Sequence, residues 1–291
     1  MVARFLAVIT LAAAPAAAFV PSSAIRSTVA SSPLRSTLRP QQSTAHLPAA
    51  HLPRTRCAAA ARELDTDALV KYGSAIGIQM AGLTAFLGAL DQAAALAGVD
   101  QVPFAARFAV FLVLALKTRA FNPLNNRRPD FEKAVSGEAT RGFNDRVMPS
   151  WTPPGVTFPI MWVLIVAPLR AYASTLVLAA HGGAFLDPAV LALMLHLSIG
   201  DTWNTINNAE RRLGAAVPGV FCVWLSVINA ARVYGEADPT AGLCLAATSV
   251  WITVAGLLIF DTYRVNNADG DEPLYPYVGQ ASTKFAWSLP F

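Results

Sequence analysis

Downstream of residue 63, long apolar runs alternate with short polar breaks along the chain. The runs lack the period-two alternation of apolar and polar residues that marks the strands of a membrane barrel. Most of them approach the roughly 20 residues that a helix needs to cross a bilayer, where backbone polar groups must be paired within their own segment. The pattern therefore predicts an all-α, polytopic membrane helix bundle with six spans: 68–99, 104–121, 155–180, 188–206, 214–233 and 241–262.

The first of these spans differs in character from the other five. It is rich in Gly and Ala, and it carries Lys71 near its start and Asp91 near its end. Its Gly73-x-x-x-Gly77 spacing would let a second helix approach closely, although that spacing alone is weakly specific. The sequence leaves two interpretations open for this segment, a spanning helix and a helix lying on the bilayer.

Composition favours a lipid-embedded chain. Hydrophobic residues make up 54% of the 291 residues and charged residues only 14%, against roughly 25% charged in a typical soluble domain. Seven of the 22 Lys and Arg residues lie within residues 1–62, so the remaining chain holds 15 bases against 18 acids. It has no basic stripe and no reading motif, and we expect no nucleic-acid partner.

The first 62 residues have the composition of a two-part targeting sequence. Residues 1–18 combine Arg4, a short apolar core and a run of small residues, as in a secretory signal peptide. Residues 19–62 contain six Arg but no acid until Glu63, as in a transit peptide. Together they resemble the bipartite plastid presequences of algae with complex plastids and predict a plastid membrane, either envelope or thylakoid. The alternative is a secretory signal followed by a Ser/Pro-rich linker, which would place the protein in a secretory-pathway membrane.

The basic residues of the mature chain lie on one side of a six-span topology. The opposite loops, around 100–103, 181–187 and 234–240, contain no Lys or Arg. The positive-inside rule then places both ends of the mature chain on the stromal or cytosolic side. The basic residues of that side are Arg127, Arg128, Lys133, Arg141, Arg146, Arg211, Arg212 and Arg264.

A rigid motif precedes the third span. Thr152 is a suitable N-cap and Pro153 suits the first helical position, where its missing N–H would have been unpaired. Pro154 extends the stiff entry, and Trp151 is an indole suited to the membrane interface. Trp162 lies eleven residues further on, about three helical turns, so it is expected to point the same way as Trp151.

This Trp-x-Pro-Pro opening, followed by Phe158 and Trp162, resembles the start of the second helix in the TspO/MBR (translocator protein) family. The resemblance covers about residues 103–267. It implies a TspO-like five-helix domain at 102–267, with 63–101 as an extra N-terminal helix and 268–291 as a loosely ordered tail. Further positions fit the family's third, fourth and fifth helices: Trp203, Arg211, Gly214, Ala216, Trp251, Ala255, Leu258, Arg264 and Asn266.

The resemblance implies binding of porphyrins or related tetrapyrroles, with a role in tetrapyrrole handling or stress response. Its implied ligand-binding residues are Trp151, Pro153, Pro154, Trp162, Trp203 and Trp251. Two alternatives remain open, a light-dependent porphyrin-degrading enzyme and a divergent membrane scaffold without a ligand pocket. The sequence assigns no catalytic residue, metal site or resident cofactor, although a porphyrin or haem-type ligand fits. The expected partners are the lipid bilayer, a hydrophobic small molecule and, as an open option, a second copy of the chain.

Polar residues within the spans suggest a polar cavity formed by Arg170, Asp201 and Asn204. If the third and fourth spans are antiparallel neighbours, Arg170 and Asp201 lie at similar depths and can form an ion pair. His196 is expected to form an interhelical hydrogen bond rather than to ligate haem.

Several positions depart from the family pattern, and these departures affect the ligand more than the fold. Arg170 stands where the family usually has Gly. Asn207 and Asn208 replace an aromatic pair, and Ile259 replaces an Asn.

Overall fold

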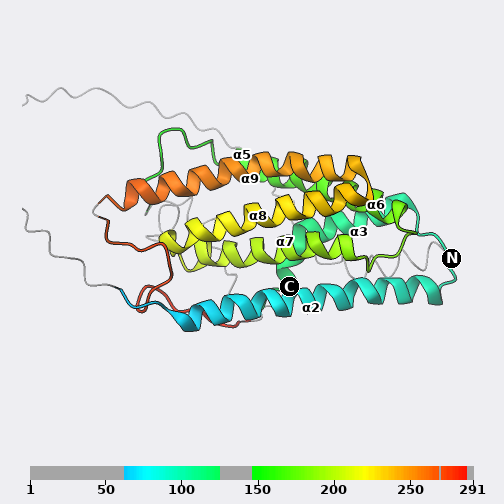
Figure 1. Cartoon of the computed structure of the whole chain (residues 1–291), viewed down its shortest axis with the longest axis horizontal. Coiled ribbons are helices and arrows are strands. Elements are labelled where there is room, and N and C mark those ends of the chain that lie inside the picture. Colours follow the sequence, from blue (N-terminus) through cyan, green and yellow to red (C-terminus); the bar gives the residue numbers. More distant parts are fainter. Residues whose placement is uncertain (1–61, 125–145, 269, 287–291) are drawn as a thin grey trace, which may run out of the picture.

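The computed structural model describes residues 62–124, 146–268 and 270–286 of the chain (Figure 1). Its described segments are helical apart from turns, irregular connections and two isolated β-bridges. This confirms the prediction of an all-α membrane bundle. The predicted signal peptide and nearly all of the transit-like segment lie outside the described residues, so the targeting sequence stays a prediction.

The six predicted spans correspond to six helical rods. The first is α2 (Thr66–Leu96), and the second is α3 (Phe104–Lys117) with the 3₁₀ turn η2 (Thr118–Phe121). The third rod joins three consecutive segments, α5 (Thr157–Pro159), η4 (Ile160–Val166) and α6 (Ala167–Ala180). The last three are α7 (Pro188–Asn204) with η5 (Thr205–Ala209), α8 (Leu213–Ala237) and α9 (Pro239–Asn266).

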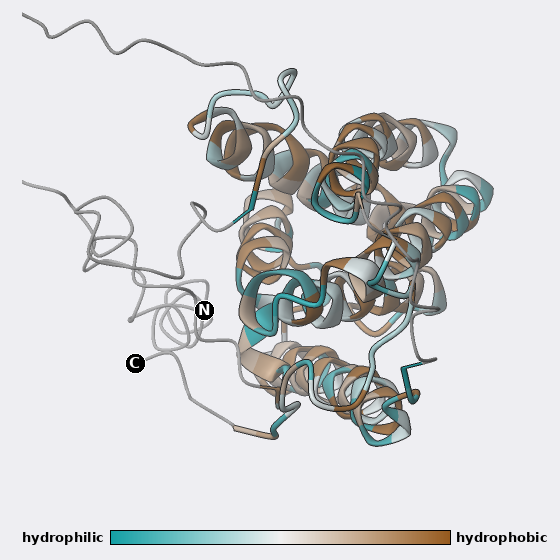
Figure 2. Ribbon diagram, turned by 90° about the vertical axis from the view of Figure 1, so that its left-hand side faces the viewer, coloured by the Kyte–Doolittle hydropathy of each residue, from teal (hydrophilic) through white to brown (hydrophobic). Residues whose placement is uncertain are grey.

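Five of the rods form a closed circuit of contacts, and α2 lies outside it. Along the circuit, α3 packs on α6, α6 on α9, α9 on α8 and α8 on α7, and η2 touches α7 to complete it. The α2 helix runs along the outside of this circuit and contacts α7 and η2 (Figures 1 and 2). The arrangement is that of a five-helix bundle with one added helix.

The surface of the bundle fits a bilayer. Four rods are long and apolar enough to span a membrane: α2, the 157–180 rod, α8 and α9. Large apolar side chains on these rods point outward, including Leu164, Leu243 and Val250, which are 64%, 71% and 65% exposed. In the view along the bundle, hydrophobic residues occupy much of the outer helix surfaces (Figure 2). Lipid is the environment that covers such a surface.

Polar contacts at three depths attach α2 to the bundle. Near its start, Asp65 forms an ion pair with Arg212 at 2.8 Å. In its middle, Gln79 donates to the Asp201 carboxylate at 2.8 Å. Near its end, the Asp91 carboxylate accepts from the backbone N–H groups of Phe185 and Leu186 at 2.7 and 2.8 Å. These contacts place α2 beside α7 and η2, and its length and apolar composition favour the spanning interpretation of this segment.

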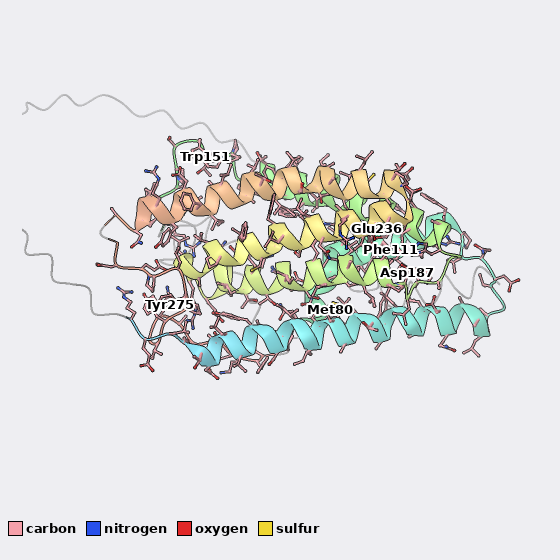
Figure 3. All side chains as sticks on the ribbon, viewed as in Figure 1. Met80, Phe111, Trp151, Asp187, Glu236 and Tyr275 are labelled. Carbon is pink, nitrogen blue, oxygen red and sulfur yellow. The ribbon has the colours of Figure 1, made fainter. Side chains whose placement is uncertain are left out.

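The C-terminal segment is packed against the bundle, contrary to the prediction of a loosely ordered tail. The backbone N–H of Val278 donates to Glu63 O, and that of Asp65 donates to Pro276 O. The fully buried Arg212 donates to Ala281 O at 2.8 Å. Sequence reasoning missed this docking because its main acceptors are backbone carbonyls, which leave no trace in side-chain composition. Tyr275 lies close to the start of α2 (Figure 3).

The two ends of the bundle differ in charge. The start of α2 and the end of α9 lie at the same end (Figure 1). Arg146, Arg212 and Arg264 belong to the loops and helix ends found there. At the opposite end, Arg107 and Arg232 lie within helices, and Arg232 forms an ion pair with Glu236. This distribution agrees with the predicted loops, while the side of the membrane stays a prediction.

Candidate functional site

The double-proline motif opens the third rod later than predicted. The α-helix begins at Thr157, and the Thr152 hydroxyl donates to Pro149 O at 2.6 Å instead of capping a helix. A residue that precedes proline is driven out of the helical region, and this restriction falls on Thr152 and Pro153 in turn. The prediction of Thr152 as N-cap was therefore wrong. Trp151 also lies before the helix, so it does not share a helical face with Trp162.

A π-helical segment, η4, follows directly and carries Trp162. It lies between Pro159 and Pro168, neither of which has a backbone N–H to continue the usual ladder. The helix widens there, so the Ala167 N–H bonds to Trp162 O, five residues back. Such π segments occur frequently at functional sites, and this one determines the direction of the Trp162 ring.

Tryptophans from three rods pack on one apolar core, which we call the aromatic cluster. Its buried centre is formed by Val223, Val227 and Ile252 of α8 and α9. The partly buried side chains packed against this centre are Trp162, Ile199, Trp203 and Trp224. The Trp203 Nε1–H donates to Ala216 O at 3.0 Å, and a Cβ on Gly219 would lie 2.9 Å from Trp203 Cδ1. The position of Trp203 therefore depends on a glycine in the facing helix.

Trp251 lies beside Ile252 of the cluster and is 8% exposed. Its ring meets that of Phe158 edge-on at 5.7 Å between centroids. Its buried Nε1–H has no hydrogen-bond partner. An unpaired buried donor is costly, so a ligand acceptor at this position would be favoured.

Trp151 is separate from the cluster. It is 45% exposed, and its Nε1–H donates to the Asp261 carboxylate at 2.8 Å. Figure 3 shows it on the outer side of α9. The structure thus brings Trp162 and Trp203 together and leaves Trp151 outside.

A buried polar group adjoins the aromatic cluster. The Arg170 guanidinium lies over the Trp162 ring, 5.6 Å from its centroid, and its Nη2 donates to His196 Nε2 at 2.6 Å. Because arginine is a donor only, His196 Nε2 is the acceptor and carries no hydrogen. His196 Nδ1–H is then free to donate to Ser226 Oγ at 2.9 Å. Both ring nitrogens are occupied, as expected of an interhelical hydrogen-bonding histidine.

Asp201 belongs to a different polar group. Its carboxylate accepts from Gln79 of α2 and lies 3.8 Å from Arg119 Nε of η2. The prediction of an Arg170–Asp201 ion pair was therefore wrong. Within the described residues, Arg170 donates to His196, whereas Asp201 contacts Gln79 and Arg119. The sequence argument compared the depths of the two residues but could not foresee that α2 supplies a competing partner.

Asn204 lies in a third polar group, at the end of α7. Its amide donates to Gly200 O, and its oxygen accepts from Asn208. Asn207 receives two hydrogen bonds from Arg146, at 2.9 Å to Oδ1 and 2.8 Å to its backbone oxygen. The three residues proposed for a polar cavity thus have separate partners. Sequence reasoning missed Gln79 and Ser226, because a lone polar residue in an apolar helix reveals no partner. Phe158 was noted as part of the motif, but its contact with Trp251 was not foreseen.

The fold and the aromatic cluster define a polytopic α-helical membrane protein with tryptophans gathered between its helices. Residues 131–265 match the model of the TspO/MBR family. The matched segment, which resembles the TspO/MBR family, includes the third rod, α7, α8 and most of α9 but not α2 or α3.

Two relatives align with part of the chain. Protein CrtK of Rhodobacter capsulatus is 28% identical over 129 residues, which are 43% of this chain and 78% of that protein. The tryptophan-rich sensory protein of Cereibacter sphaeroides is 25% identical over 118 residues, 40% of this chain and 72% of that protein.

Proposed function

We propose that this membrane protein binds a porphyrin or related tetrapyrrole on the aromatic cluster. The proposal rests chiefly on the convergence of Trp162, Trp203 and Trp224 from three rods on one apolar core. Their rings are only partly buried, which leaves aromatic surface for a flat ligand to stack on. The similarity of residues 131–265 to the TspO/MBR family supports the same ligand class.

Trp251 forms a second wall of the proposed site through its contact with Phe158. Pro153 and Pro154 act indirectly, because they fix where the third rod begins. Trp151 was included among the ligand residues on sequence grounds. Its hydrogen bond to Asp261 and its exposure make it a contact of the site's periphery at most.

The test is a titration of the purified protein in lipid nanodiscs with protoporphyrin IX, followed by the shift of porphyrin absorption. Absorption is preferable to tryptophan emission, because energy transfer to a porphyrin also quenches distant tryptophans. Trp162→Leu removes a stacking ring without breaking any hydrogen bond that we observe. An aromatic contact contributes about 0.5–1.5 kcal/mol beyond its area, so the affinity should fall roughly two- to tenfold.

Trp151→Leu is the matched control, since it deletes the same side chain outside the cluster. We expect it to leave the affinity within about twofold of the wild type. Saturable binding that weakens in Trp162→Leu and persists in Trp151→Leu supports the proposal. Absence of saturable binding, or equal loss in the two variants, rejects it.

A plastid location extends the proposal, with a role in tetrapyrrole handling or stress response. Tetrapyrroles are made in plastids, and residues 1–62 have the composition of a bipartite plastid presequence. Fusing residues 1–62 to a fluorescent protein in an alga with complex plastids tests this address. Plastid fluorescence supports it, and fluorescence confined to the secretory pathway contradicts it.

A further inference from the structure

Arg170 is a buried cation with few partners. It lies in α6, one of the membrane-spanning rods, and is 6% exposed. Arginine carries five N–H donors, but among the residues the structure describes its one hydrogen-bond acceptor is His196 Nε2. Its Nε is buried without a partner. An ionisable group in this position is expensive and marks a functional position by default.

Arg212 shows how this molecule treats a buried arginine with a structural role. Arg212 is fully buried, and its guanidinium contacts the carboxylates of Asp65 and Glu210 at 2.8 and 3.0 Å. It also donates to the backbone of Ala281 and, more weakly, of Tyr277. Arg170 has neither a carboxylate within ion-pair distance nor a backbone acceptor in the described residues. Arg107 also has a single neutral acceptor in the described residues, Gln101, but it lies in the first turn of α3, at the end of the bundle. Arg170 instead lies inside a spanning rod and over the Trp162 ring, and this placement indicates that its guanidinium is available for a partner that the protein does not supply.

The carboxylate nearest in effect to Arg170 is engaged by other groups. Asp201 is the carboxylate whose field reaches Arg170, but its oxygens are already engaged by Gln79 and Arg119. His196 contributes no charge, because its Nε2 accepts from Arg170. Arg170 therefore has no carboxylate of its own among the described residues of a low-dielectric bundle, an arrangement that attracts an anion.

We propose that Arg170 is the counter-charge for an ionised carboxylate of the bound ligand, so that the site selects tetrapyrroles bearing free acid groups. The argument rests on the tetrapyrrole-binding function proposed above. The Arg170 guanidinium lies over the Trp162 ring, so a carboxylate held there leaves the attached macrocycle within reach of the aromatic cluster. Arg170 also occupies a position where the family usually has Gly, which makes this selectivity a property of the present chain.

The experiment compares protoporphyrin IX with its dimethyl ester, which has the same macrocycle without ionisable groups. A charge-assisted hydrogen bond in a desolvated site predicts at least about tenfold tighter binding of the acid by the wild-type protein. The ratio of the two affinities is then measured in Arg170→Met and Arg170→Lys. Comparing ratios between proteins cancels the different partition of acid and ester into lipid.

Arg170→Met keeps an unbranched apolar stem but removes the charged guanidinium, so we expect its acid-to-ester ratio to fall to about one with ester affinity retained. Arg170→Lys keeps the cation and should retain part of the preference. Arg107→Met is the matched control, because Arg107 in α3 is likewise buried, with Gln101 of the preceding loop as its acceptor, but it lies away from the aromatic cluster, at the end of the bundle. It should keep the wild-type ratio.

A wild-type acid-to-ester ratio no greater than that of empty nanodiscs overturns the proposal without any variant, which keeps the test decisive if Arg170→Met fails to fold. A preference for acid that survives in Arg170→Met also overturns it. Either result leaves ester binding in place and so spares the proposed tetrapyrrole function. If neither porphyrin binds, the proposed function itself fails, and the carboxylate site fails with it.

Discussion

Replacing Gly214 by alanine should release the C-terminal segment from the bundle. An alanine Cβ at this position would lie 2.1 Å from the backbone oxygen of Pro273, a distance that no side-chain carbon tolerates. The Gly214 N–H also donates to the Glu272 carboxylate at 2.7 Å, so the segment cannot retreat without breaking that bond. A hydrogen bond to a charged group contributes about 1.5–3 kcal/mol. The free energy that holds residues 270–286 in place should fall by at least about 1.5 kcal/mol, which is about tenfold in the open population.

Hydrogen–deuterium exchange measures this opening directly. The amides of Val278 and Asp65 report on it, because they bond to Glu63 O and Pro276 O across the contact between the tail and α2. We expect both to exchange about tenfold faster in Gly214→Ala. Gly73→Ala is the control, since a Cβ there meets nothing within 4 Å. Unchanged protection of Val278 in Gly214→Ala would refute the packing described for this segment.

Three further predictions test other parts of the fold. Burial alone would raise the pKa of Asp65, but the Ala68 N–H and the Arg212 guanidinium outweigh it and lower the pKa below its usual 3.8. The stabilisation from this depressed pKa is complete at neutral pH and is lost as the pH falls below about 4. The hydrogen-exchange protection of residues 270–286 should therefore drop below that pH in the wild type. Asp65→Asn should lack this pH dependence. Asp91→Ala leaves two backbone donors of Phe185 and Leu186 without their acceptor and should destabilise the protein by about 1.5–3 kcal/mol in reversible unfolding, with a wild-type value contradicting the contact. Gly242→Ala places a Cβ 2.6 Å from Gly235 Cα and should lower the free energy of unfolding by about 1–3 kcal/mol in the same assay. Gly256→Ala is the control, because its Cβ meets only Val220 at 3.8 Å and should not lower stability measurably. Equal effects of the two variants would show that α8 and α9 do not approach as closely as described.

The sequence predicted the rods well because hydrophobic runs and their polar breaks are local signals. The second rod was predicted at 104–121, and α3 with η2 covers those residues. The start of the third rod was misplaced, because two adjacent prolines impose extended backbone on their predecessors, an effect that outweighs the capping preference of Thr152. Local patterns also could not reveal the packing of the tail, which depends on backbone carbonyls and a buried arginine far apart in sequence.

The candidate site could likewise be predicted only in part: its tryptophans could be chosen from the sequence, but the partners of its polar residues could not. Trp162 and Trp203 could be chosen from the sequence because they occupy positions of the family motif, and the structure gathers them in one cluster. The partner of Arg170 could not be foreseen, since depth along two helices does not specify which neighbour a side chain faces. His196 and Asp201 both lie in α7, and the contribution of Gln79 from α2 decides between them.

An experimental structure of the protein with bound protoporphyrin IX tests the central claim most directly. The account predicts macrocycle density in contact with the Trp162 and Trp203 rings, with one acid group at the Arg170 guanidinium. Density for the porphyrin elsewhere on the bundle, with the aromatic cluster unchanged and unoccupied, would contradict it.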